Sequence, residues 1–466
     1  MMKEPSHGME VTDKGTISMR NQYLAAFTCS VLSLFYGQAI GWSSFAVPQL
    51  MDGILGEPFT QADSGWVGGS LCLGALVSSP IYGLLANAKG RKFVAYVAGV
   101  LFLISWCIMV AADSLLWVLL ARFLTGVGSA GGSTIVSIYN NEIADPRVKA
   151  SLGGLLAMGY TTGLLFAYIL GAWLPYTYVV VIYICLCALF FPAWWFMPET
   201  PAYLMLKGCE KEALLTLQWL LGPDGSHAQN AFNRLKKEQA GAVKPSSLRE
   251  FFQDAAAKKA IVLALVLMSV LSFSGVFAVL SYASGIISRS GGLLSPTAGS
   301  MLFGCAMVCG SLLPTFIGDK MPRKLSLGIS CVMVSSGMAT LGTLQLLQAQ
   351  GLDISDSWLG VLPIVALSTT VFFHFVGLGS VTYVAVMEMF SDKTRGVAGT
   401  LIATIMWFAS FLLLQFFGLT VEAFGDYSVF FFFSSVCAFG LFFICVFIPE
   451  LSGKTPNEIE AILLKR

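Results

Sequence analysis

The chain has 466 residues, of which 56% are hydrophobic and only 11% are charged, and its mean hydropathy is +0.76. An ordinary soluble domain carries roughly 25% charged residues, so this composition excludes a soluble fold. The formal net charge of +1 provides no basic surface for nucleic acid, which excludes that class of partner.

In chain order, the apolar residues form about twelve runs, each close to the ~20 residues that cross a bilayer as a helix. Six runs precede a polar interval between Pro198 and Lys259, and six follow it. The runs cover approximately residues 22–46, 64–86, 93–112, 115–138, 150–173, 178–197, 260–286, 296–318, 325–347, 361–387, 396–421 and 427–448. The sequence therefore predicts an all-α membrane protein with about twelve transmembrane helices.

Lysine and arginine predict the orientation, because short cytoplasmic loops retain them. They gather in the two termini, in the polar interval and in every second loop, whereas the remaining loops are acidic and have Arg289 as their only base. We expect five segments: a cytoplasmic N-terminus (1–21), a six-helix half (22–197), cytoplasmic linker helices (198–259), a second six-helix half (260–448) and a cytoplasmic tail (449–466).

The two halves share short markers in the same order. Three pairs of markers recur at close to half the chain length: Gly90-Arg91-Lys92 with Pro322-Arg323-Lys324, Glu142 and Lys149 with Glu388 and Arg395, and Pro198-Glu199 with Pro449-Glu450. This recurrence predicts a duplicated six-helix unit with the same membrane orientation in each copy. Two parallel halves around a midplane site are the architecture of a rocking transporter.

Taken together, the markers resemble those of one family. They are Asn87-Ala-Lys-Gly-Arg-Lys92, Arg122-Phe-Leu-Thr-Gly-Val-Gly128, Tyr139-Asn-Asn-Glu142, Pro198-Glu-Thr-Pro201, Glu388 to Arg395-Gly396, and Pro449-Glu-Leu-Ser-Gly453. The chain resembles the sugar porters of the major facilitator superfamily, and among them the insect trehalose transporters and the facilitative hexose carriers. The resemblance implies the major facilitator fold, a sugar substrate and transport by alternating access.

The resemblance also implies a cytoplasmic gate of charged residues that pair when the carrier faces outward and separate when it faces inward. Its members here are Arg91, Arg122, Glu142, Lys149, Glu199, Arg323, Glu388, Arg395 and Glu450. The alternative is that these charges only anchor helix ends at the membrane surface. Where the family has an arginine after its Pro-Glu-Ser-Pro motif, this chain has Ala202, so the gate is thinner than usual.

The substrate site departs further from the family. Side-chain amides suit sugar hydroxyls because each can donate and accept, yet nearly all the family's amide positions hold other residues here, such as Ala157, Phe277 and Met307. The remaining candidates for substrate binding are Gln38, Tyr160, Thr161, Ser272, Ser274, Tyr282, His374, Tyr383, Trp407 and Ser410. The serines and threonines are equally expected at close helix contacts, and the aromatic residues could stack on a sugar or simply pack.

Proton-driven members of the family have an aspartate in the first helix, and the matching stretch Gly37-Gln-Ala-Ile-Gly41 has none, which favours facilitated diffusion. The eleven cysteines lie almost entirely in apolar runs, so we expect no metal, and we expect no cofactor. The first hypothesis is a monomeric, passive sugar carrier of the plasma membrane. A carrier of a less polar solute and a non-transporting receptor remain alternatives, and no constellation of residues indicates an enzyme.

Overall fold

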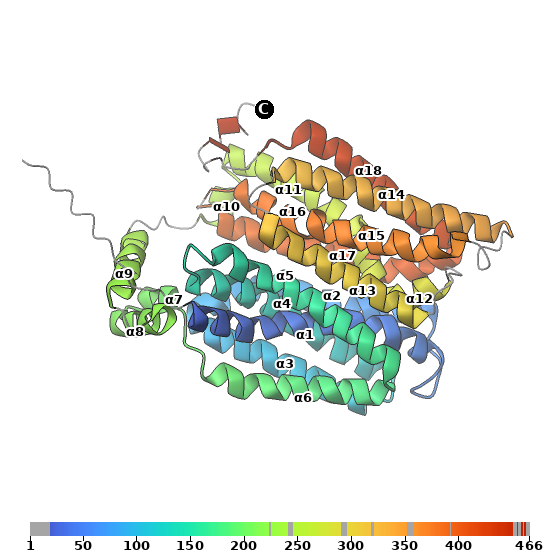
Figure 1. Ribbon diagram of the computed structural model, residues 1–466, viewed down its shortest axis with the longest axis horizontal. Coiled ribbons are helices and arrows are strands. Elements are labelled where there is room, and N and C mark those ends of the chain that lie inside the picture. The colour runs from blue at the N-terminus through green and yellow to red at the C-terminus, as the bar shows by residue number, and fades with distance from the viewer. Residues whose placement is uncertain are drawn as a thin grey trace, which may run out of the picture.

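The computed structural model describes residues 19–222, 225–240, 246–289, 296–317, 321–351, 358–391 and 393–450, together with a few residues of the C-terminal tail. Most of the predicted cytoplasmic N-terminus, and residues 451–453 of the last marker, lie outside this described part. All the regular elements of the described residues are helices (Figure 1).

The first half contains six long helices, as the apolar runs predict. They are α1 (Arg20–Met51), α2 (Gln61–Lys89), α3 (Arg91–Ala111), α4 (Leu115–Ile143), α5 (Lys149–Trp173) and α6 (Tyr176–Trp195). The polar loop residues define several of their ends. Thr60 and Asp63, for example, form a reciprocal capping box at the start of α2.

The second half also crosses six times, but two of its spans are broken. Its helices are α11 (Ala255–Phe273), α12 (Val276–Arg289), α13 (Pro296–Ile317), α14 (Arg323–Ala349), η1 (Trp358–Val361), α15 (Leu362–Val376), α16 (Leu378–Glu388), α17 (Arg395–Phe424) and α18 (Asp426–Phe447). The seventh and tenth apolar runs are therefore each two helices. The break between α11 and α12 lies at Gly275, whose φ of +82° suits only glycine, and the break between α15 and α16 lies at Gly377.

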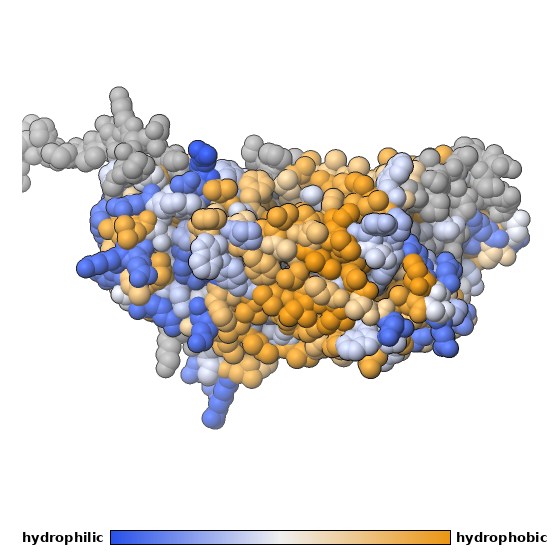
Figure 2. Space-filling view, turned by 90° about the horizontal axis from the view of Figure 1, so that it is seen from below, coloured by the Kyte–Doolittle hydropathy of each residue, from blue (hydrophilic) through white to orange (hydrophobic). Residues whose placement is uncertain are grey.

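The surface of the molecule matches a membrane protein. Eleven helical segments of the described residues are long and apolar enough to span a bilayer, and the shorter apolar stretch Ala298–Pro314 lies in α13. Figure 2 shows a broad hydrophobic band across the middle of the molecule with hydrophilic residues at both ends. The prediction of about twelve spans is confirmed.

The polar interval folds into four short helices at one end of the molecule: α7 (Pro201–Leu206), α8 (Glu210–Leu221), α9 (Gly225–Ala240) and α10 (Leu248–Phe251). We call this the linker end, and the opposite end the loop end. The side-chain amide of Asn21 donates to the Trp219 carbonyl of α8 at 2.6 Å, so α1 starts beside the linker helices. Ser247 and Glu250 form the capping box that the sequence predicts for α10.

The two halves lie side by side and contact each other along three main helix pairs, α2 with α17, α5 with α13 and α1 with α12 (Figure 1). Small residues allow the close approach of α2 and α17. A Cβ atom on Gly65 would lie 2.7 Å from the carbonyl oxygen of Gln415, so no larger residue fits there. The plane between the halves is therefore where a site shared by both must lie.

Candidate functional site

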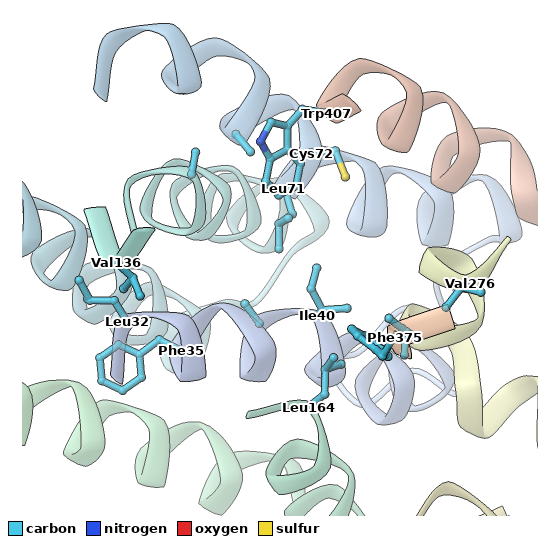
Figure 3. Close-up of a cluster of buried hydrophobic side chains, with 14 of the residues drawn as sticks. Leu32, Phe35, Ile40, Leu71, Cys72, Val136, Leu164, Val276, Phe375 and Trp407 are labelled. Carbon is cyan, nitrogen blue, oxygen red and sulfur yellow. The ribbon is translucent and has the colours of Figure 1, made fainter. Parts of the chain in front are cut away.

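Four aromatic side chains meet in the middle of this plane, two from each half. The ring of Tyr36 in α1 lies 4.7 Å from that of Tyr160 in α5 and 5.9 Å from that of Trp407 in α17. The ring of Phe375, at the end of α15, lies 6.2 Å from that of Tyr160. We call these four residues the aromatic seam. Figure 3 shows Trp407 and Phe375 among side chains of both halves, including Ile40 and Cys72.

Several of the residues that the sequence proposed for substrate binding belong to this region. Tyr160 and Trp407 are part of the seam, and the His374 ring stands edge-on to Phe375 with centroids 5.3 Å apart. Ser410 is buried one helical turn beyond Trp407. Among the described residues, the hydroxyl of Ser272 and the Nδ1 atom of His374 are buried without a hydrogen-bond partner, which is unusual for polar atoms inside a protein.

Other proposed residues are turned elsewhere. Gln38 is two positions after Tyr36, and residues advance ~100° each around a helix, so Gln38 lies on nearly the opposite face of α1 and inside the first half. The Thr161 hydroxyl lies 2.9 Å from that of Ser311, a buried contact between the halves. Ser274 donates to the Leu271 carbonyl beside the break at Gly275. Gln38, Thr161 and Ser274 therefore make structural contacts or face away from the seam.

Tyr282 belongs to a set of contacts that closes the loop end. Its hydroxyl donates to the Ser64 carbonyl of α2 at 3.3 Å. Nearby, Tyr168 of α5 donates to the Leu280 carbonyl of α12 at 2.7 Å, and Ser284 of α12 bonds to Ser44 of α1. α12 is thus held against the first half by four hydrogen bonds. Tyr383, by contrast, lies in α16 below the break in the tenth span and is 42% exposed.

At the linker end, the charged residues of the first half form one network. The Nε and Nη2 atoms of the Arg91 guanidinium donate to the Glu142 carboxylate, at 2.9 and 2.6 Å. The Thr200 hydroxyl donates to the same carboxylate. Glu199 accepts the backbone N–H groups of Arg91 and Lys92 and so caps the start of α3. Burial raises the pKa of Glu199 above its usual value, although these N–H donors act in the opposite direction.

The second half repeats this network with the equivalent residues. Arg323 donates to Glu388 at 3.3 Å, and Glu450 accepts the backbone N–H groups of Arg323 and Lys324. The Lys324 ammonium donates to the Cys445 carbonyl at 2.7 Å, just as Lys92 donates to the Trp195 carbonyl at 2.7 Å. The duplication read from the sequence thus extends to individual hydrogen bonds. The ion pairs Arg91–Glu142 and Arg323–Glu388 each lie within one half.

Three gate residues lie outside these pairs. Lys149 is the first residue of α5, and Arg395 begins α17 and donates to the Phe390 carbonyl. Arg122 does not belong to the linker end, which corrects its assignment to the cytoplasmic gate. It lies in the second turn of α4, about 30 Å along the helix from Glu142. There its guanidinium reaches α1 and α2 instead, with the Ala39 and Val67 carbonyls and the Ser43 hydroxyl as acceptors.

Sequence reasoning missed Tyr36, Phe375, Tyr168 and Ser284. The first two are ordinary apolar-face residues of their helices, and the other two matter only because α12 bends toward the first half. The kink at Tyr282, with φ −125° and ψ 23°, directs that bend. Among the described residues, no group of three or more His, Cys, Asp or Glu side chains is placed to hold a metal ion.

The family model described as sugar (and other) transporter matches residues 11–463. The chain belongs to this family. A facilitated trehalose transporter of Polypedilum vanderplanki is 28% identical over 97% of this chain and 89% of its own length. One from Drosophila simulans is 27% identical over 96% of this chain, which spans 52% of that longer protein.

Solved structures support the fold. The inward-open conformation of the xylose transporter XylE from E. coli superimposes with a TM-score of 0.80, at 19% identity, over 95% of this chain and 99% of that one. Its partially occluded inward-open conformation gives a TM-score of 0.78, at 18% identity, over 94% of this chain. The predicted major facilitator fold and the predicted membership of the sugar porters are confirmed. The expected role of a passive sugar carrier agrees with the names of these relatives.

Proposed function

We propose that this protein is a passive membrane carrier of a sugar such as trehalose or a hexose, working by alternating access. The observation that carries the proposal is the asymmetry of the contacts between the halves. At the loop end, α12 is hydrogen-bonded to α1, α2 and α5. At the linker end, the pairs Arg91–Glu142 and Arg323–Glu388 each stay within one half.

Such an arrangement suits a carrier whose halves are held together at the loop end while each half keeps its own charge network at the linker end. If the loop-end hydrogen bonds broke and the halves came together at the linker end, the aromatic seam would be exposed at the loop end instead. Each hydrogen bond contributes only about 0.5–1.5 kcal/mol, so a set of four can form and break repeatedly. The duplicated networks beside Glu199 and Glu450 keep each half rigid during this motion.

Passive transport is supported by two features. The relatives above are named facilitated transporters. In addition, the buried guanidinium of Arg122 is bound only by neutral groups in the described part, so the intramembrane charge there has no carboxylate to exchange a proton with.

A second candidate is a carrier of a less polar solute. It is favoured by the aromatic seam, which offers ring faces where the family has amides, and by the turn of Gln38 away from that seam. Ring faces bind the apolar C–H faces of sugars as well as other flat apolar groups. The seam alone is compatible with both kinds of solute.

Counterflow in proteoliposomes separates these possibilities. Vesicles loaded with unlabelled trehalose or glucose should accumulate the labelled sugar transiently, and a protonophore should leave the accumulation unchanged. Counterflow with only a less polar solute, such as an alkyl or aryl glycoside, would select the second candidate. Protonophore-sensitive uptake would reject the passive mechanism, and absence of counterflow with correctly inserted protein would favour a receptor.

We also propose that the protein resides in the plasma membrane as a monomer with the linker end in the cytoplasm. The concentration of lysine and arginine at that end supports the orientation. Proteolysis of intact cells carrying epitope tags at either terminus should spare both tags. Removal of either tag without permeabilisation would contradict the orientation.

A further inference from the structure

Arg122 is a buried charge without a counter-ion in the described part of the chain. Its side chain is 1% exposed, lies within a membrane-spanning helix and donates to two carbonyls and one hydroxyl. Its guanidinium carbon also lies 5.0 Å from the ring of Trp42. Intramembrane charges of this kind are costly and are normally paired with an opposite charge. The positive charge of Arg122 is therefore only partly balanced.

Trp42, whose ring Arg122 contacts, belongs to a group of buried polar side chains with atoms that have no hydrogen-bond partner among the described residues. We call them the donor cluster: Gln38, Trp42, Trp106, Tyr176 and Tyr183. All are at most 5% exposed. The Trp42 ring contacts those of Trp106 and Tyr176, with centroids 6.4 and 6.1 Å apart, and the Trp106 ring lies 4.8 Å from that of Tyr183. Gln38 is one turn before Trp42 on the same face of α1.

The chemistry of the cluster is biased toward donors. The indole N–H groups of Trp42 and Trp106 can only donate, and the amide nitrogen of Gln38 also only donates. The amide oxygen of Gln38 is the one unpartnered atom of the cluster that can only accept. A water molecule would have to donate as often as it accepts, so water matches this set poorly. A group that only accepts hydrogen bonds matches it well.

Electrostatics point the same way. Tyr176 is the first residue of α6, so the partially positive N-terminal end of that helix adds to the field of Arg122. We propose that Arg122 and the donor cluster form a binding site for a small inorganic anion, chloride being the natural occupant. The site lies inside the first half, between α1, α3, α4 and α6. None of its members belongs to the aromatic seam.

The role that follows is to stabilise the first half. An anion bound there would neutralise the guanidinium and join four helices, so the folded protein would bind it and the unfolded chain would not. Ligands of the folded state raise the unfolding temperature in a saturable way.

The test is the unfolding temperature of the purified full-length protein at constant ionic strength, with chloride or bromide replacing gluconate. We expect a saturable rise on the order of 3 °C with either halide. Arg122→Gln should abolish the rise. Because that variant could fail to fold, Trp42→Phe and Tyr183→Phe, which keep the rings and remove one donor each, should shift the half-saturating halide concentration upward at least about threefold, and both can be checked for a single elution peak.

Trp194→Phe is the matched control. Trp194 is buried in the same half, but its indole N–H already donates to the Lys92 carbonyl outside the cluster. It should lower the unfolding temperature without changing the halide response. Equal responses to gluconate and halide, or unchanged half-saturation in both Trp42→Phe and Tyr183→Phe, would show that the neutral partners of Arg122 suffice and would overturn the proposal. No transport is measured, so the outcome is independent of the proposed carrier function.

Discussion

Ser284 of α12 bonds twice to Ser44 of α1, its backbone N–H donating to the Ser44 hydroxyl at 2.9 Å and its own hydroxyl to the Ser44 carbonyl. These residues are 240 positions apart and belong to different halves. Two small hydroxyl side chains allow the backbones to come this close. This pair joins α12, one half of a broken span, to the opposite half of the molecule.

Replacing both serines by alanine should shift the carrier toward its outward-facing form. Each lost hydrogen bond removes about 0.5–1.5 kcal/mol from the closed arrangement. A membrane-impermeant thiol reagent should therefore label a cysteine introduced at Val47, which is 5% exposed near the same end of α1, at least about threefold faster. Ser281→Ala is the control, because the Ser281 hydroxyl donates only within its own helix, to Phe277. Equal labelling of the double variant and the control would contradict the role of the pair.

The pair Arg91–Glu142 should matter more to stability than an exposed pair of the same chemistry. The two side chains are 8% and 19% exposed, and Glu142 also accepts from Thr200. Glu142→Gln leaves the guanidinium without its charge partner and should lower the free energy of unfolding by about 2–4 kcal/mol. Glu238→Gln, in the exposed i,i+4 pair with Arg234, should lower it by less than about 0.5 kcal/mol.

Thermal unfolding of the two variants in the same detergent measures this difference. Similar small shifts in both would mean that the buried pair is as solvent-screened as the exposed one. A loss of transport without a loss of stability in Glu142→Gln would instead assign the pair to the conformational cycle rather than to the rigidity of the first half.

The fold could be predicted because its signals are strong and local. Long apolar runs, lysine and arginine in alternate loops, and three markers repeated in order predict the twelve spans and their duplication. Equivalent residues such as Lys92 and Lys324 do make equivalent bonds. The breaks at Gly275 and Gly377 were not predicted, because a glycine inside an apolar run has no local signature of whether the helix continues through it.

The site was harder to predict, because it depends on which face of a helix a residue occupies. Gln38 and Tyr36 are two residues apart in α1, yet only Tyr36 reaches the other half. Arg122 looked like a gate residue because its motif resembles the family's, but its position in the second turn of α4 puts it far from the linker end. The packing of the helices decides which face of a helix turns toward the site and how far along the span a residue lies. A single sequence does not contain that packing.

Glu199 should make stability depend on pH. Its folded-state pKa is raised by burial, above the ~4.3 of a glutamate in an unfolded chain. Between these two values the folded protein holds more protons than the unfolded chain, so this residue's contribution to stability increases as pH falls through that window and decreases as pH rises. We therefore expect the unfolding temperature of the wild type, measured relative to that of Glu199→Gln, to rise as the pH is lowered from 7.5 to 4.5. A wild type that loses stability faster than the variant would contradict this sign.

Packing of α1 on α5 depends on glycine at position 37. A Cβ atom there would overlap the Tyr160 carbonyl and lie 2.9 Å from the Leu164 nitrogen. Gly37→Ala must push the two helices apart and should lower the free energy of unfolding by more than about 3 kcal/mol. Gly153→Ala in α5, where a Cβ meets nothing within 4 Å, should be neutral or slightly stabilising. Equal unfolding temperatures for the two variants would contradict the close packing of α1 on α5 at Gly37.

The aromatic seam should contribute to solute affinity through Trp407. Its ring is 4% exposed and contacts Tyr36 of the opposite half, whereas the next residue, Phe408, is 49% exposed on the outer face of α17. Trp407→Ala removes a stacking surface worth about 1 kcal/mol or more and should raise the half-saturating solute concentration at least about fivefold. Phe408→Ala removes a ring from the same helix without touching the seam, so it should leave that concentration unchanged. Counterflow rates over a range of solute concentrations, normalised to the amount of reconstituted protein, measure both. If the two variants changed only the maximal rate and by the same factor, the seam would be a packing contact between the halves and the solute would bind elsewhere along their interface.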